Sequence, residues 1–280
     1  MPSAGSPVGT RYEQQGRESC DRLVAAALAT DEDGWTPIGT NKDVFIMKKS
    51  PQKGEASSVN CVKGTAIVRA PPDFVYRVLK TRGNVGKFDD MLKEARVIDE
   101  ISDTTRLVHL LYKAMWPTSA RDFTVITTAG RYDVSTLVEA AMSVVDERIP
   151  EERGYVRGNV VCGGYVIRAL SDQPEMSEVT YVSQAEFKGN IPTFAVNKVT
   201  ESQPMCVAAL RAVAEETYAA SRNEPHQTRE LEDQRLARFD QTFADSAYLT
   251  ATSDLSGKRR RKEGKWGGVR NCPEPFSGVE

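Results

Sequence analysis

The sequence is poor in the residues that build metal centres and disulfide frameworks. Its 280 residues include only two histidines. The cysteines are odd in number, widely scattered and without a Cys-x-x-Cys pair: Cys20, Cys61, Cys162, Cys206 and Cys272. This pattern argues against both a disulfide framework and a structural zinc site. We therefore expect reduced thiols, no metal and no cofactor.

The sequence also lacks a strong net charge and a long apolar run. The formal net charge is -2 and the pI is about 5.9, which excludes the basic footprint of most nucleic-acid-binding domains. No stretch approaches the roughly 18 apolar residues of a membrane span. The first ten residues contain no apolar signal-peptide core. We expect a monomeric protein of the cytoplasm that does not bind nucleic acid.

Composition divides the chain into three parts. Residues 1–17 are rich in Ser, Gly, Pro and charged residues, which predicts a disordered tail. Residues 18–220 carry the apolar periodicity of one folded domain, and 40% hydrophobic residues in the whole chain are enough for a sizeable core. Residues 221–280 form a charged and mostly disordered extension, in which residues 227–243 are a candidate short helix.

Helical and strand periodicities alternate in the first part of the domain. Apolar residues recur at helical spacing over residues 19–31. Residues 43–48 and 60–70 are rich in alternating and β-branched residues, which predicts two strands. A helix is predicted over residues 72–83, with prolines at its start and a glycine at its end.

From residue 95 the apolar period changes to two. Four candidate strands form a meander: ARVIDEI, TTRLVHLLYKA, DFTVITTAGR and VSTLVEAAMSVV. GNVVCGGYVIRAL and EVTYVSQAEF add two more, giving seven to nine strands, and Gly163 and Gly164 predict a bulge or bend. From Ile191 the helical period returns, which predicts a long C-terminal helix kinked at Pro204. Because the sheet must curl around this helix to bury its apolar face, we expect an α+β helix-grip fold.

Three segments resemble one lipid-binding family. WPTSARDF at 116–123 is similar to the P-x-S-x-R-D-F/Y segment of START (StAR-related lipid transfer) domains, and GYVRGN at 154–159 is similar to their G-x-I/V-R segment. VTYVSQAEFKGNIPTFAVNKV at 179–199 resembles their last strand and lid helix. The segments occur in family order, and the resemblance covers about residues 21–219. Their wording is nearest to the phosphatidylcholine and ceramide transfer branches.

The resemblance implies a function without catalysis. START domains enclose a hydrophobic tunnel, closed by the C-terminal helix, that holds one sterol, phospholipid or ceramide. We therefore expect a lipid-binding protein that visits membranes transiently and transfers its cargo between them. The alternative is a lipid-sensing regulatory domain without transfer activity, and an assay of transfer between vesicles separates the two.

The resemblance also implies which side chains surround the lipid. Inward positions are expected on two neighbouring strands: Val108, Leu110, Tyr112, Phe123, Val125 and Thr127. The lid helix is expected to seal the tunnel with an apolar stripe: Ile191, Phe194 and Val199. An amphipathic helix that packs on a core without any ligand would carry the same stripe.

Four positions bear on the identity of the lipid. Steroidogenic-type sterol carriers place an acidic residue and an arginine near the positions of Leu110 and Thr127, and this sequence has neither charge. Phosphatidylcholine carriers surround choline with aromatic rings, of which only Phe123 has a match. Ceramide carriers place an amide near the position of Gln184, which either contacts the ligand or faces solvent.

The remaining polar strand residues favour structural roles. Arg121 and Asp122 are adjacent on a strand and are expected to form structural ion pairs or hydrogen bonds. His109 has no serine or cysteine placed beside it by any motif, so we expect no catalytic site and no enzymatic activity. Three strand tyrosines either bind a head group or pack in the core: Tyr112, Tyr165 and Tyr181.

One run of cations stands out in the C-terminal extension. Lys258, Arg259, Arg260, Arg261 and Lys262 are consecutive in a setting rich in Gly and Ser. The run is consistent with a nuclear localisation signal bound by an import receptor, with a tether to anionic lipids, or with a solvated tail.

Overall fold

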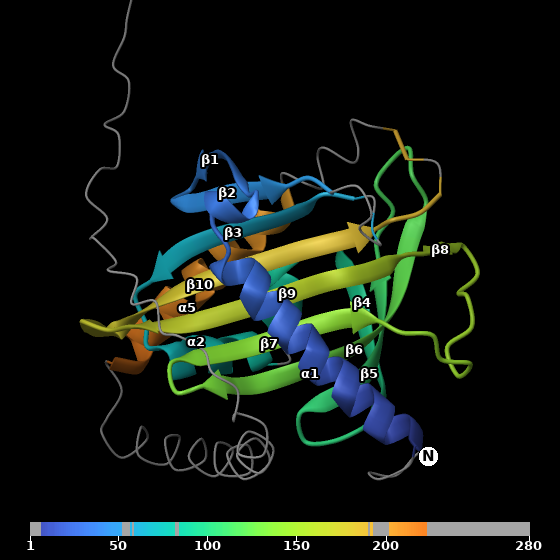
Figure 1. The fold of residues 1–280 in the computed structure, drawn as a ribbon, viewed down its shortest axis with the longest axis horizontal. Coiled ribbons are helices and arrows are strands. Elements are labelled where there is room, and N and C mark those ends of the chain that lie inside the picture. The colour runs from blue at the N-terminus through green and yellow to red at the C-terminus, as the bar shows by residue number, and fades with distance from the viewer. Residues whose placement is uncertain are drawn as a thin grey trace, which may run out of the picture. The chain divides into compact units, whose positions relative to one another are not determined.

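The computed structural model describes residues 7–51, 57, 59–81, 84–189, 191–192 and 202–222 (Figure 1). The helices and 3-10 turns are α1 Pro7–Leu28, η1 Asp31–Asp33, α2 Pro72–Lys80, α3 Val85–Phe88, η3 Gln203–Met205 and α5 Cys206–Arg222. The strands are β1 Thr36–Asn41, β2 Val44–Lys49, β3 Cys61–Val68, β4 Leu92–Glu100, β5 Thr105–Tyr112, β6 Ala120–Asp133, β7 Thr136–Ser143, β8 Tyr155–Arg157, β9 Asn159–Leu170 and β10 Gln173–Glu186. None of these helices is long and apolar enough to cross a membrane.

All ten described strands belong to one open, curved sheet. The order is β1-β2-β3-β10-β9-β7-β6-β5-β4, and β8 pairs with β6 outside this path. Every pairing is antiparallel except that between β6 and β8. The expected meander of β4 to β7 is confirmed. The predicted strand number is too low because β1 is wholly exposed and contains Pro37 and Gly39, and β8 has only three residues.

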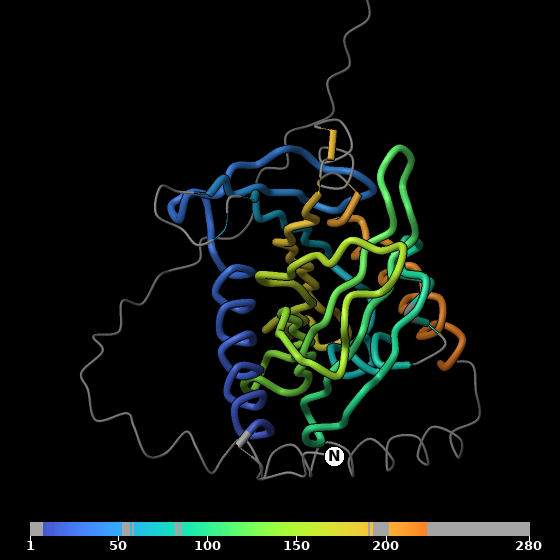
Figure 2. The backbone as a smooth tube through the Cα atoms, turned by 90° about the vertical axis from the view of Figure 1, so that its right-hand side faces the viewer, coloured from blue at the N-terminus to red at the C-terminus, as the bar shows by residue number. Residues whose placement is uncertain are grey.

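Helices cover the two faces of the sheet differently. α1 runs across one face, whereas α2, α3 and α5 lie on the other (Figures 1 and 2). Successive side chains of one strand point alternately into the two layers. In β9, Val166 packs in the α1 layer, and Ile167 packs against α5 and α2. The C-terminal helix therefore packs on the sheet as the helix-grip expectation requires.

The N-terminal helix is longer than predicted. α1 begins at Pro7, so residues 7–17, expected to be a disordered tail, are helical. Tyr12 explains the extension, because its ring is 1% exposed in a cluster that includes Leu107 and Ile126. Its hydroxyl also donates a hydrogen bond of 2.7 Å to Asp146. One aromatic residue in a polar stretch gives no periodic signal that would predict this helix.

The C-terminal helix also begins elsewhere. Ile191 and Pro192 have no helical structure, and Pro204 lies in the 3-10 turn between the helical residue Ser202 and the start of α5. The kink at Pro204 stays a prediction. Residues 193–201 lie outside the described residues. So do residues 223–280, which include the candidate helix at 227–243 and the basic run.

Candidate functional site

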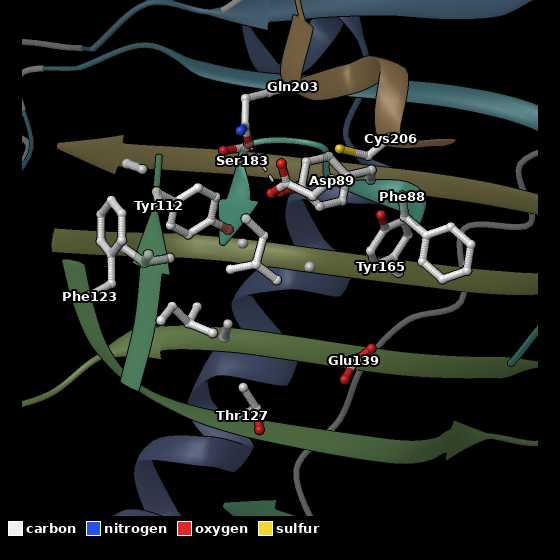
Figure 3. A pocket seen from close by; sticks show the side chains of 18 of the residues that line it. Phe88, Asp89, Tyr112, Phe123, Thr127, Glu139, Tyr165, Ser183, Gln203 and Cys206 are labelled. Atoms are coloured by element: carbon white, nitrogen blue, oxygen red, sulfur yellow. Dashed lines mark hydrogen bonds between the residues drawn. The ribbon is translucent and has the colours of Figure 1, made fainter. Parts of the chain in front are cut away.

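A cavity lies between the sheet and the helices of the α5 side (Figure 3). Its volume is about 210 Å³, many times the roughly 10–15 Å³ that one water needs. Apolar and small residues form most of its wall: Leu79, Phe88, Leu92, Leu110, Phe123, Ala141, Val160, Gly163, Gly164, Ala185, Phe187 and Cys206. The polar remainder consists of Asp89, Tyr112, Thr127, Glu139, Tyr165, Tyr181, Ser183 and Gln203.

Strands β5 and β6 supply the expected part of this wall. Leu110 and Phe123 are cross-strand partners, and both line the cavity together with Tyr112 and Thr127. The ring centroids of Tyr112 and Phe123 are 5.5 Å apart in an edge-on contact, which fixes both rings. Four of the six inward positions predicted on these strands therefore come together around one space.

The other two predicted positions on these strands support the wall from behind. Val108 and Val125 share the cavity face of β5 and β6, and their side chains are 6% and 0% exposed. Both pack in one cluster with Phe123 and are not among the residues that line the space. Their contribution is to hold the Phe123 ring in place.

Gln184 points away from the cavity. Its neighbours Ser183 and Ala185 line the space, so alternation along β10 directs Gln184 to the α1 face. There its Nε2 donates a hydrogen bond of 3.2 Å to the carbonyl oxygen of Val59. The interpretation of Gln184 as a ligand contact is therefore corrected: Gln184 lies one residue away from the positions of β10 whose side chains face the cavity.

Most of the predicted lid lies outside the residues that the structure describes. Ile191 is half-buried and is not among the residues that line the cavity. Phe194 and Val199 belong to residues 193–201 and lie outside the described residues. Their contact with a ligand stays a prediction.

Two carboxyl groups in the cavity were missed by the sequence reasoning. Asp89 follows α3, and its Oδ1 accepts a hydrogen bond of 3.1 Å from the backbone N–H of Met91. Burial raises the pKa of Asp89, and hydrogen bonding from Tyr112 partly opposes the rise. Glu139, on β7, forms an ion pair of 2.7 Å with Lys80 of α2. Asp89 directly follows Phe88, the last residue of α3, so no regular period of apolar residues would place it in the cavity.

The cavity tyrosines are neutral hydrogen-bonding groups. Burial raises the pKa values of Tyr112, Tyr165 and Tyr181 well above the ordinary value of 10.0. The ring centroids of Tyr165 and Tyr181 are 4.7 Å apart. The Tyr181 hydroxyl donates a hydrogen bond of 3.1 Å to Oε1 of Gln203, which ties β10 to the turn before α5.

A charged network lies behind the cavity wall, on the α1 face. Asp122 is fully buried, and its Oδ2 lies 2.8 Å from Nε2 of His109 and 2.7 Å from Nη2 of Arg157. Burial alone would raise the pKa of Asp122, but hydrogen bonds from Arg157 and His109 lower it below its usual range. Arg121 lies on the opposite face of β6 from Asp122 and donates hydrogen bonds to the carbonyl oxygens of Ser119, Phe187 and Lys188. These contacts are structural, and neither Arg121 nor Asp122 lines the cavity.

Comparison with known proteins assigns the family. The chain matches the family described as START domain over residues 15–214. It is 26% identical over 195 residues to "Steroidogenic acute regulatory protein, mitochondrial" of Oncorhynchus mykiss, covering 67% of this chain and 64% of that protein. The Xenopus laevis "Steroidogenic acute regulatory protein" is 27% identical over 194 residues, covering 67% and 65%. The chain thus spans somewhat less than two thirds of the length of these curated relatives.

Solved structures show the same fold. "Human StAR-related lipid transfer protein 5" matches with a TM-score of 0.66 and 19% identity, covering 74% of this chain and 98% of that one. Human STARD10 matches with a TM-score of 0.62 and 18% identity, covering 83% and 87%. The helix-grip architecture is therefore confirmed, and with the match over residues 15–214 the chain belongs to the START domain family.

Proposed function

We propose that the chain binds one lipid in this cavity and transfers it between membranes. The supporting observation is a space walled mainly by aliphatic and aromatic side chains between the sheet and α5. A lipid tail gains about 0.8 kcal/mol for each methylene group removed from water, so such a space stabilises a lipid outside a membrane. The related structure named as a lipid transfer protein points to the same function.

Filling the cavity tests the binding step. Ala141 on β7 lines the space, so Ala141→Phe places a ring where the lipid would lie. We expect native mass spectrometry to show a stoichiometric lipid on the wild type and none on folded Ala141→Phe. Val134→Phe, at a position that is 91% exposed, is the matched control and should keep the lipid. Retention of the full complement of lipid by Ala141→Phe would contradict the proposal.

An exposed tryptophan is the proposed membrane contact for transfer. Trp116 lies in the loop between β5 and β6 and is 88% exposed, which is unusual for a large aromatic side chain. Tryptophan is favoured where apolar and wet surroundings meet at a membrane surface. We expect Trp116→Ala to slow lipid transfer between vesicles severalfold while leaving the bound lipid unchanged. A wild type that binds lipid without transferring it would favour the sensing alternative.

The compartment, the oligomeric state and the basic run stay predictions from the sequence. We propose a monomer that works at the cytoplasmic surface of membranes, with residues 258–262 as a tether to anionic lipids. Deletion of residues 258–262 should then weaken binding to phosphatidylserine vesicles without changing the lipid content of the cavity. A loss of nuclear location without a loss of vesicle binding would support the import-receptor interpretation.

A further inference from the structure

The charged side chains among the described residues of the cavity wall have one sign. Among the described residues that line the space there is no lysine, arginine or histidine, whereas Asp89 and Glu139 both contribute carboxyl groups (Figure 3). A charge in an apolar enclosure acts more strongly than the same charge in water. The carboxyl groups of the wall therefore disfavour any ligand that brings a further negative charge into the cavity.

The two carboxyl groups differ in their partners. Glu139 is balanced by Lys80, whose Nζ lies 2.7 Å from Oε1. Asp89 has hydrogen-bond donors, including the N–H of Met91, but no ion pair joins it to a cation within the described part of the chain. A buried carboxylate is stabilised by a positively charged partner. Asp89 is therefore the group in this wall that a cationic ligand would satisfy.

Aromatic rings surround the same space. Within the described part of the chain, six of them line it: Phe88, Tyr112, Phe123, Tyr165, Tyr181 and Phe187. The face of an aromatic ring attracts cations within about 6 Å, by roughly 0.5–2 kcal/mol depending on desolvation. A carboxyl group combined with several rings is the arrangement that recognises ammonium groups, while the aliphatic remainder of the wall suits a hydrocarbon tail.

We propose that the cavity selects a lipid whose polar end is a protonated amine, with the ammonium group placed against Asp89 and the neighbouring rings. This inference rests on the proposed lipid-binding function and names the chemical class of its cargo. Lipids with an anionic end, such as fatty acids and phosphate-bearing lipids, are disfavoured because their charge meets carboxyl groups and finds no cation among the described residues of the wall.

Three C18 ligands that differ only at the polar end test the proposal. Octadecylamine, octadecanol and octadecanoate, delivered from cyclodextrin to the delipidated full-length protein at pH 7, have the same tail. We expect the amine to bind at least tenfold more tightly than the alcohol, and the carboxylate to bind weakest. Equal affinities of amine and alcohol, or tighter binding of the carboxylate, would overturn the proposal.

The chain supplies a matched pair of variants. Asp89→Asn removes the charge with little change of shape, and Asp90→Asn makes the same change at the exposed neighbour, which does not line the cavity. We expect Asp89→Asn to reduce the preference for amine over alcohol to less than threefold and to leave alcohol binding unchanged, while Asp90→Asn keeps the preference. An undiminished preference in folded Asp89→Asn would refute the role of Asp89; if this variant does not fold, the wild-type series decides.

Failure of this inference differs from failure of the proposed function. A protein that takes up the alcohol, or a lipid from mixed liposomes, but shows no preference for the amine has a lipid cavity without amine selectivity. A protein that takes up none of the three ligands and no liposome lipid has no lipid-binding function at all.

Discussion

Asp122 holds two elements together from a fully buried position. Its carboxylate binds His109 on the neighbouring strand and Arg157 on β8. We expect Asp122→Asn to lower the free energy of unfolding by about 3–5 kcal/mol, because the change leaves a half-buried guanidinium without its counter-charge. Urea denaturation measures this loss. Glu152→Gln, which removes an exposed ion pair with Arg96, should cost less than about 1 kcal/mol.

The same residue predicts a pH dependence. The pKa of Asp122 is lowered in the folded state, so its stabilisation is present above the unfolded pKa of about 3.9 and is lost as pH falls towards the folded pKa. Asp146, whose pKa is lowered by Arg148, acts in the same direction. The stability difference between wild type and Asp122→Asn should therefore shrink below about pH 4. A constant difference down to pH 2 would contradict the network as described.

Gly164 permits a close approach in the cavity wall. Its φ is +139°, and a Cβ there would lie 1.9 Å from the carbonyl oxygen of Glu139. We expect Gly164→Ala to destabilise the protein by several kcal/mol, which thermal unfolding would report. Gly86→Ala is the control, because no described atom beyond its chain neighbours and its own helix backbone lies within 4 Å of the added Cβ. A Gly164→Ala variant as stable as Gly86→Ala would show that β7 and β9 are not so closely packed.

Lys63 binds the C-terminal end of helix α1. Its Nζ lies 2.5–3.1 Å from the carbonyl oxygens of Ala26, Ala27 and Ala29, and 4.4 Å from the centroid of the Trp35 ring. The side chain thus satisfies acceptors that every helix C-terminus leaves free. We expect Lys63→Met to cost about 1–3 kcal/mol and to increase hydrogen exchange in the last turns of α1.

Lys48→Met, on the adjacent strand β2, is the control for Lys63. Lys48 is half-exposed, so its substitution should leave exchange in α1 unchanged. Equal exchange in the two variants would show that α1 does not depend on the lysine at its end.

The strands in which apolar residues alternate with others were predictable from the sequence. In β5 and β6 apolar residues recur with period two, and Leu110, Tyr112, Phe123 and Thr127 reach the cavity as expected. The orientation of Gln184 was not predictable, because successive residues of a strand face opposite sides of the sheet and an error of one residue reverses the assigned face. The β9–β10 pairing does shift between Gln184 and Ala185, where their partners change from Cys162 to Val160, just before the Gly163-Gly164 pair where the sequence predicts a bulge.

Three polar residues of the cavity wall could not be predicted, for a different reason. Asp89 and Gln203 lie at helix boundaries, outside any regular period, and reach the cavity through tertiary packing. Glu139 was hidden because a charged residue at that point of a strand normally indicates the solvent face. Its burial depends on Lys80, which is distant in sequence and comes from α2.

At the scale of the whole molecule, ligand occupancy and stability should be linked. A ligand that binds only the folded state stabilises it by about 2.7 kcal/mol at a free concentration 100 times its Kd. For a domain of this size we expect the Tm to rise by roughly 5–10 °C on reloading the delipidated protein. Differential scanning calorimetry checks this, with Ala141→Phe as a variant that should show no rise. An unchanged Tm of the loaded wild type would contradict burial of the ligand in the fold.

Strand β6 contributes side chains to two layers of the molecule. Phe123 and Thr127 face the cavity, whereas Asp122 and Thr124 are buried on the face that α1 covers. We expect substitutions at the first pair to change what the cavity can hold, and substitutions at the second pair to change the stability of the domain. On that expectation, the lining of the cavity can diverge in evolution while the fold around it persists.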